Sequence, residues 1–244
     1  MARSAISQRR FTPRQFNNSV IHTQTNGDHI TTGDAWDSTT EDATFHLWLK
    51  WSVLAADSSN QHILAHTDGT GSGNSLAFQS NTGNRILTNY GTGINNVVGT
   101  ISDFNKHLLS MTFDISENIA LWYIDGVLKY TGDLVNEGAN GAMRIGSNKG
   151  GSQSLNGKTS QFLFFKRVQG AAEIADYYFD NIIDQTNLTN WLEYTDGSGT
   201  TVTATIGSNA TIVDLLWDTI DPFKQRAAIS QARSAISQAR SAIT

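Results

Sequence analysis

The chain has 244 residues, no cysteine and a formal net charge of −5 at pH 7. The lack of cysteine excludes a disulfide framework, a thiolate metal site and a cysteine nucleophile, and no run of about 18 apolar residues marks a membrane span. With 21 glycines and only two prolines among many Thr, Asn and Ser residues, the composition favours short strands with polar turns over a helical bundle.

The charges are distributed unevenly along the chain. Eight of the 17 basic residues lie in 1–14 and 224–244, where there is no acidic residue, so residues 15–223 carry nine basic and 22 acidic residues, a net charge of −13. Basic ends on an acidic body predict tails that dock on an acidic partner, with two merely solvated tails as the alternative. The acidic body disfavours nucleic acid as a partner.

Residues 1–18 form a predicted basic N-terminal arm. The arm contains Arg3, Arg9 and Arg10 and has no apolar segment of the kind found in signal peptides. We therefore expect synthesis in a host cytoplasm without an export signal, which suits a virion protein released by lysis.

From residue 19 onward, apolar runs alternate with turns rich in Gly, Asn and Asp. Phe45, Leu47, Leu49 and Trp51 recur at period two, which indicates a strand with one buried face. Further strands are expected on both sides of Asn26-Gly27 and at 61–66, 74–80, 85–90, 95–101 and 108–113.

The stretch 106–167 carries the sharpest local signals. Asp125-Gly126 joins two apolar runs, and Asp-Gly tolerates the positive φ that a two-residue hairpin turn needs. After the last apolar run of this stretch, Ile174, Tyr178 and neighbouring apolar residues have helical spacing, which predicts a short helix over 170–181.

The order of these motifs resembles a known family. Leu-Trp-Tyr-Ile-Asp-Gly at 121–126, then Arg-Ile-Gly at 144–146, then Asn-Gly at 156–157 before another strand is similar to the laminin-G-like, concanavalin-A-like jelly-roll domains. The resemblance implies an all-β sandwich over 19–184 that mostly binds ligands, often glycans, and catalyses only in some branches of the family.

Residues 185–221 resemble a short module found beside such domains in phage and bacterial surface proteins. The pattern consists of Trp191-Leu192, an acidic residue, Gly-Ser-Gly-Thr, a Val-x-Ala strand and a closing Trp. We expect a small β extension packed on the sandwich, or a small subdomain.

A seven-residue repeat occupies the predicted C-terminal helix over 222–244. Ile at one seam position and Ala at the other would form a thin apolar seam, and Asp221-Pro222 is a good helix start. The seam residues and their basic neighbours are Ile229, Ala232, Arg233, Ile236, Ala239, Arg240 and Ile243. The repeat predicts a homo-oligomer, with a trimer as the first expectation.

Part of this repeat, Arg-Ser-Ala-Ile-Ser-Gln, occurs again at 3–8 with Ile6 at its centre. Two copies at opposite ends suggest a docking motif for repeated equivalent sites, such as those of a symmetric shell. A product of DNA-repeat slippage and a low-complexity extension without a partner remain alternatives.

Few residues point to chemistry. No strand carries the paired carboxylates of a retaining glycosidase. His62 and His66 lie on an expected strand, which argues for a structural or exposed role over a metal site. Trp36 and Tyr90 are the candidate glycan-binding aromatics. By resemblance to calcium-binding relatives, Asp68 and Asn74 beside a Gly-rich loop are weak candidate ligands for Ca²⁺; otherwise no cofactor is expected.

These observations favour a non-enzymatic virion structural protein of a bacteriophage, acting in capsid decoration or as a fibre or tail appendage. Its expected partners are further copies of itself, capsid or tail components, and a host-surface glycan. A bacterial surface or secreted lectin-like adhesin is the alternative, and a glycan hydrolase or lyase with an unrecognised site is the third possibility.

Overall fold

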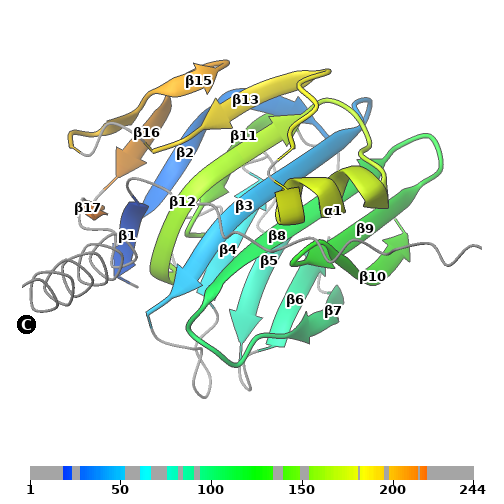
Figure 1. Ribbon diagram of the computed structural model, residues 1–244, viewed down its shortest axis with the longest axis horizontal. Coiled ribbons are helices and arrows are strands. Elements are labelled where there is room, and N and C mark those ends of the chain that lie inside the picture. Colours follow the sequence, from blue (N-terminus) through cyan, green and yellow to red (C-terminus); the bar gives the residue numbers. More distant parts are fainter. Residues whose placement is uncertain are drawn as a thin grey trace, which may run out of the picture.

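A computed structural model gives the fold of the chain (Figure 1). The structure describes residues 19–23, 28–52, 61–66, 76–81, 85–90, 94–133, 140–148, 154–180, 182–194, 198–213 and 215–218. The predicted N-terminal arm and the predicted heptad helix lie outside these residues and stay predictions.

Two antiparallel sheets face each other as a sandwich (Figure 1). Sheet A has the order β10 (Val127–Asp133), β9 (Ile119–Ile124), β8 (Lys106–Asp114), β3 (Ala43–Trp51), β12 (Asn156–Phe165), β1 (Ser19–Thr23) and β17 (Leu216–Asp218). Beside this path β13 (Leu188–Leu192) pairs with β12 and with β15 (Ala204–Ile206).

Sheet B is the second layer. Its order is β14 (Thr201–Val202), β16 (Ala210–Val213), β2 (His29–Asp37), β11 (Asn140–Ile145), β4 (Gln61–His66), β5 (Leu76–Asn81), β6 (Arg85–Tyr90) and β7 (Ile94–Thr100). The predicted all-β sandwich is therefore confirmed, with strands close to the expected positions.

The main core lies between the sheets because strand side chains alternate between the two faces. Phe45, Leu47, Leu49 and Trp51 of β3 all point inward and are nearly fully buried, as their spacing predicts. Phe45 stacks on Phe164 of the neighbouring β12 with ring centroids 4.8 Å apart. Such aromatic pairs add to the hydrophobic stabilisation of the core.

The hairpin between β9 and β10 confirms the turn signal. Asp125 and Gly126 have φ values of 54° and 74°, the left-handed conformation that a two-residue type I′ turn requires at both positions. The Asp125 carboxylate also accepts a hydrogen bond from the Leu108 amide at 2.9 Å, which ties the turn to β8.

Helix α1 (Ala171–Asp180) lies across the outer face of sheet A (Figure 1). It begins and ends within one residue of the predicted bounds. Ile174 and Tyr177 are its buried residues, and Tyr177 joins an outer apolar cluster with Trp48, Leu108, Leu163, Phe165 and Leu188. The helix therefore gives sheet A a second, smaller core on its outer side.

The strands after residue 185 extend both sheets of the sandwich. Strand β1 pairs with residues 156–159 of β12, and β13 pairs with residues 162–165 of the same edge. Strand β16 pairs with β2, and β17 pairs with β1. Main-chain hydrogen bonds therefore join these strands to both layers.

In the described part of the chain no helix is long and apolar enough to span a membrane.

Candidate functional site

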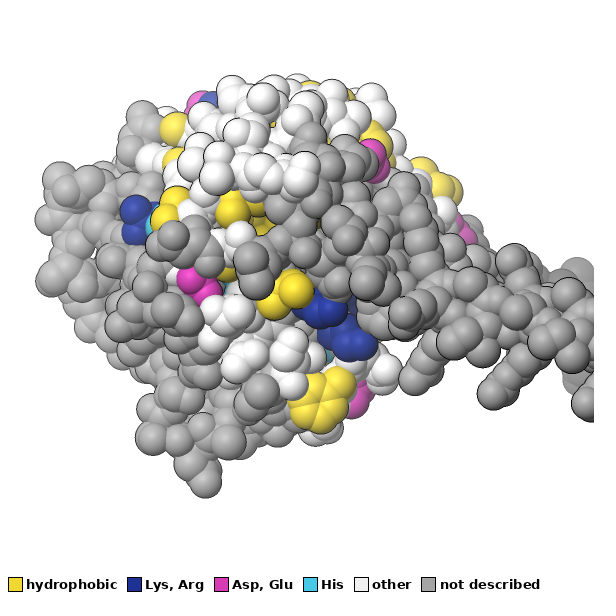
Figure 2. Space-filling view, turned by 90° about the vertical axis from the view of Figure 1, so that its left-hand side faces the viewer, with side chains coloured by type: hydrophobic (Ala, Val, Ile, Leu, Met, Phe, Trp, Pro, Cys, Tyr) yellow, Lys and Arg dark blue, Asp and Glu magenta, His cyan; other side chains and the backbone are white. Residues whose placement is uncertain are grey.

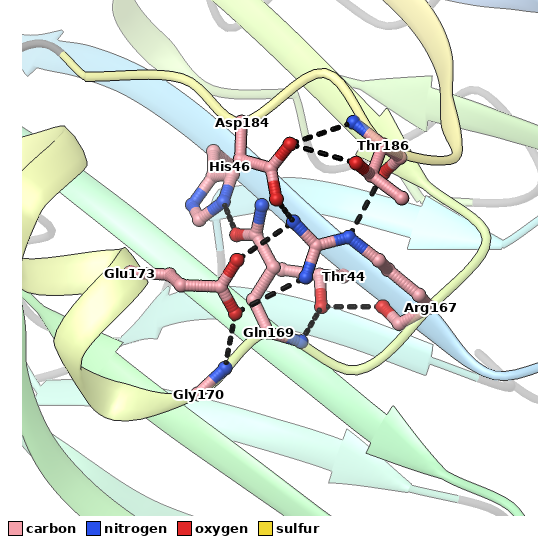
Figure 3. A network of polar contacts seen from close by, with 8 residues as sticks. All are labelled: Thr44, His46, Arg167, Gln169, Gly170, Glu173, Asp184 and Thr186. Atoms are coloured by element: carbon pink, nitrogen blue, oxygen red, sulfur yellow. Dashed lines mark hydrogen bonds and ion pairs between the residues drawn. The ribbon is translucent and has the colours of Figure 1, made fainter.

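Beside α1, the outer face of sheet A contains a pocket of about 190 Å³ with a polar network at its rim (Figure 3). Carboxylates from α1 and from the segment after it lie near the buried His46 of β3, and apolar side chains line the rest of the pocket. The lining residues are His46, Leu163, Phe165, Gln169, Glu173, Asp176, Tyr177, Ile182, Ile183 and Asp184.

Arg167 is the centre of the network. It lies two residues after the end of β12, and its guanidinium donates two hydrogen bonds to Glu173, at 2.7 and 3.1 Å. It also donates to Asp184 at 3.2 Å and, through Nε, to the Thr186 carbonyl at 2.8 Å. Bidentate arginine–carboxylate pairs are among the stronger polar contacts in proteins. Arg167 thus joins the end of β12, the helix and the segment after the helix.

Glu173 also defines where α1 begins. Its carboxylate accepts a hydrogen bond from the Gly170 amide at 2.9 Å, in the way that the third helical residue of a capping box satisfies the amide of the N-cap. Arg167 and then this amide lower the pKa of Glu173 below its ordinary value. The carboxylate is therefore ionised at neutral pH, and both of its oxygens accept hydrogen bonds.

His46 lies beneath this rim with both ring nitrogens bonded. Nε2 is 2.6 Å from the side-chain oxygen of Gln169, which can only accept, so Nε2 carries the hydrogen. Nδ1 then accepts from the Ser110 hydroxyl at 2.8 Å. Burial lowers the pKa of His46 to about 4, so the ring is neutral at physiological pH.

We call the contacts of Arg167 with Glu173 and Asp184, together with the Glu173–Gly170 hydrogen bond, the latch. A glycosidase acid needs a carboxyl with a raised pKa, whereas Glu173 and Asp184 both have lowered pKa values, the latter chiefly through hydrogen bonds from Thr186. The pocket is also smaller than the roughly 300–1,000 Å³ of typical ligand pockets. Its clearest role is to fix α1 and the segment after it on sheet A.

Trp36, one of the two predicted glycan-binding aromatics, requires a correction. It lies on β2 with 1 % of its surface exposed and packs between Phe45 and Phe113 in the main core. Its indole N–H donates to the Glu41 carbonyl at 2.8 Å. Because both ring faces contact protein, Trp36 has no surface on which a sugar could stack.

The other predicted site residues are only partly described. Tyr90 is the last residue of β6, where it pairs with Leu76 and Ile94 of the flanking strands, and its side chain lies outside the described part. Asp68 and Asn74, the weak calcium candidates, lie outside the described residues, as do all anchoring residues of the two terminal segments.

The histidines of β4, His62 and His66, are both buried, which favours the structural role over the exposed one. His66 Nε2 lies 3.0 Å from the carbonyl oxygens of both Trp36 and Gly141, so it donates to them and joins β4 to the adjacent β11 and to β2 beyond it. Across the residues that the structure describes, no three His, Asp or Glu side chains form a group suited to a metal ion.

Sequence reasoning missed the latch. The helical spacing over 170–181 gave Glu173 no role, whereas in the structure Glu173 accepts hydrogen bonds from Arg167 and Gly170. The spacing Gly170-x-x-Glu173 at the start of a predicted helix was an available capping signal. Arg167 had no comparable signal, because its partners depend on how α1 folds back over the sheet.

The two facing antiparallel sheets define a lectin-like β-sandwich. The family model described as the concanavalin A-like lectin/glucanases superfamily matches residues 24–175, and the chain belongs to this superfamily. No curated protein sequence matches the chain.

Several solved structures share the fold at low identity. A candidate carbohydrate-binding protein from Bacteroides ovatus has a TM-score of 0.63 and 11 % identity, with 86 % of this chain and 62 % of that chain covered. The native heptameric SAP-like pentraxin from Limulus polyphemus has a TM-score of 0.56 and 13 % identity, with 81 % and 96 % covered.

A sialidase from Trypanosoma rangeli, solved as a covalent intermediate with 2,3-difluorosialic acid, has a TM-score of 0.51 and 14 % identity. The match covers 67 % of this chain but only 32 % of the sialidase. This chain therefore spans less than two thirds of the Bacteroides ovatus protein and about a third of the sialidase.

Proposed function

We propose that this chain is a non-enzymatic, glycan-binding structural protein of a virion. The observation that carries glycan binding is the lectin-superfamily sandwich itself, matched over residues 24–175. The Bacteroides ovatus protein, whose name refers to carbohydrate binding, aligns with 86 % of this chain. Both observations support glycan binding through the sandwich fold.

The non-enzymatic part of the proposal rests on the site chemistry. In the described network Glu173 and Asp184 are both held by Arg167, and both have lowered pKa values. A hydrolase would need one carboxyl kept protonated as a general acid. The likeness to sialidase keeps a glycan hydrolase as the second candidate, and the same experiment can test it.

The virion part of the proposal rests on the sequence. The basic ends, the acidic body and the terminal repeats suit a protein anchored in a larger assembly, such as a capsid decoration, fibre or tail appendage. Self-association is part of the proposal, and the heptameric pentraxin is an example of an oligomer built from this fold. A bacterial surface or secreted adhesin is the alternative setting.

An array of neutral and acidic glycans, probed with full-length protein, tests glycan binding. We expect retention of at least one glycan class without release of reducing ends on prolonged incubation. Tyr90→Ala should weaken that binding at least fivefold, whereas Tyr130→Ala, on β10 of the other sheet, is the matched control. Release of reducing ends would favour the hydrolase, and no retention of any glycan would refute the proposed function.

A further inference from the structure

The pocket beside α1 combines a buried apolar floor with an apolar side chain exposed at its rim. Leu163 and Phe165 of β12 line the floor and are almost fully buried. Ile182, in the segment after α1, also lines the pocket but keeps 58 % of its surface exposed. An apolar group inserted here would remove this surface from water, which is favourable.

The volume of the pocket determines the kind of group that it accepts. At about 190 Å³ it is smaller than most ligand pockets, but a cavity of about 150 Å³ lined by Leu, Ile and Phe can hold a benzene ring. His46 at its base is kept neutral by burial, so an apolar group can cover it without desolvating a charge. The pocket therefore suits one phenyl side chain.

The polypeptide around the pocket is acidic. Residues 171–186, which form α1 and the segment after it, contain four acidic residues and no basic one. Within the latch, the single Arg167 guanidinium is shared by the Glu173 and Asp184 carboxylates (Figure 3), which leaves one positive charge against two negative ones. The Asp184 side chain is 56 % exposed, so a further cation can approach it from solvent.

The N-terminal end of β1 directs the chain toward this pocket. Val20 pairs with Thr159 of β12, and the two strands are antiparallel. Leu163 and Phe165 follow Thr159 by four and six residues, so they lie about 13 and 20 Å farther along the sheet, on the side from which the chain enters β1. On the edge of the molecule near β1, the visible acidic side chains lie apart from one another (Figure 2).

The predicted N-terminal arm carries groups that complement the pocket. Residues 1–18 contain four arginines and no acidic residue, so their formal charge is opposite to that of residues 171–186. Phe11 lies in the sequence Arg-Arg-Phe-Thr-Pro-Arg at 9–14, with arginines on both sides of it. A phenyl ring between cationic groups matches an apolar pocket with carboxylates at its rim.

Chain length distinguishes Phe11 from the other phenylalanines of the terminal segments. Phe11 is nine residues before Val20, and an extended chain of that length reaches about 30 Å, beyond both floor residues of the pocket. Phe16 is four residues before Val20 and reaches only about 13 Å, the distance to the nearer floor residue alone. Phe223 of the C-terminal segment lies close to Asp221, whose charge the carboxylates at the rim would repel.

We propose that the pocket beside α1 is the docking site of the chain's own N-terminal arm. The Phe11 ring occupies the pocket, and the arginines beside it pair with carboxylates of α1 and of the segment after it. This contact is separate from the proposed glycan binding and does not depend on it. It gives the basic arm an acidic partner within the same molecule, so another acidic partner can bind the arm only by displacing it from the pocket.

Disulfide trapping in the full-length protein tests the proposal, because the chain has no cysteine of its own. Thr12→Cys lies next to Phe11, and Gln185→Cys is exposed next to Asp184 at the rim. We expect this double variant to form an intramolecular disulfide with oxidised glutathione, identified by mass spectrometry of the linked peptides. Adding Phe11→Ser should slow the linkage at least fivefold, whereas Phe16→Ser is the matched control and should leave the rate within twofold.

Raised salt should also slow the linkage, because it screens the contacts between arginine and carboxylate. Equal linkage rates with and without Phe11→Ser would overturn the role of the ring, and a complete lack of linkage would overturn the docking site. A disulfide formed chiefly between two molecules would place the arm on a second copy and overturn docking within the chain. The urea midpoint of each variant checks that the sandwich is folded in all of these comparisons.

Discussion

Two buried imidazoles in sheet A experience opposite electrostatic surroundings. The hydrogen-bond partners of His46, Ser110 and Gln169, are both neutral, and burial lowers its pKa to about 4. His107 has a carboxylate on each ring nitrogen, with Nδ1 at 2.7 Å from Asp125 and Nε2 at 3.0 Å from Asp103. Burial lowers the pKa of His107, but the hydrogen bonds and charges of the two aspartates raise it by more, so its net shift is upward.

His107→Gln should therefore destabilise the protein more at about pH 5.5 than at about pH 8.5. A raised folded-state pKa gives stabilisation that is complete below the unfolded value of about 6.5 and is lost as pH rises through the folded value. Urea unfolding midpoints at the two pH values measure the difference. An equal loss of stability at both pH values would contradict a stabilising ion pair between protonated His107 and its two aspartates.

His46→Gln provides the counterpart with the opposite sign. Its lowered pKa means that the stabilisation from the neutral ring is complete above about pH 6.5 and is lost as pH falls toward the folded value. The variant should therefore show a flatter decrease of stability between these limits than wild type. His22, whose pKa burial lowers to about 3, remains in both proteins and keeps part of the decrease.

At the scale of elements, the Asp125-Gly126 turn couples the edge hairpin of sheet A to α1. A Cβ on Gly126 would lie 3.1 Å from the Cβ of Tyr178 and 3.4 Å from the Cα of Ala175. The glycine thus serves two purposes, since it allows the positive φ of the turn and the close approach of the helix.

Gly126→Ala should destabilise the fold by more than the roughly 1–2 kcal/mol expected for forcing alanine into left-handed backbone. Gly199→Ala is the matched control, because Gly199 has φ of +85° and no atom within 4 Å of an added Cβ. Chemical denaturation of both variants separates strain from contact. Equal losses would show that α1 does not press on the turn.

The elements themselves were largely predictable from local pattern. Period-two spacing found β3, Asp-Gly found the hairpin, and helical spacing found α1, because each signal lies within a few consecutive residues. The side-chain partners were not predictable in the same way. Trp36 lies next to Asp34 and Asp37 in a polar sequence, yet the pairing of β2 with β11 places its ring in the core.

The candidate site illustrates the same limit over longer separations. His46 and Gln169 are 123 residues apart, and so are joined only by the pairing of β3 with β12 and the return of the chain into α1. The alignment of Lys50, Lys106 and Lys158 likewise depends on the register across three strands. One-residue shifts in pairing would move these side chains to the other face, which a single sequence cannot resolve.

At the scale of the whole molecule, the proposal that the C-terminal repeat assembles the protein can be tested on a shortened chain. The last described strand, β17, ends at Asp218 and pairs with β1, so a chain ending at residue 221 keeps every strand that the structure describes. If the repeat over 222–244 assembles the protein, full-length protein should have about three times the monomer mass of 26.6 kDa, and the shortened chain should be monomeric.

Light scattering on the two proteins measures this, and a pair of point variants separates the seam from the mere presence of the tail. Ile236→Asp puts a charge in the apolar seam, where a helix bundle would have to bury it. Ser237→Asp puts the same charge one residue later, outside the seam. Loss of the oligomer in the first variant alone would establish a helical bundle with Ile236 at its core. A monomeric full-length protein would contradict self-assembly through the repeat and leave it as a docking segment for another protein.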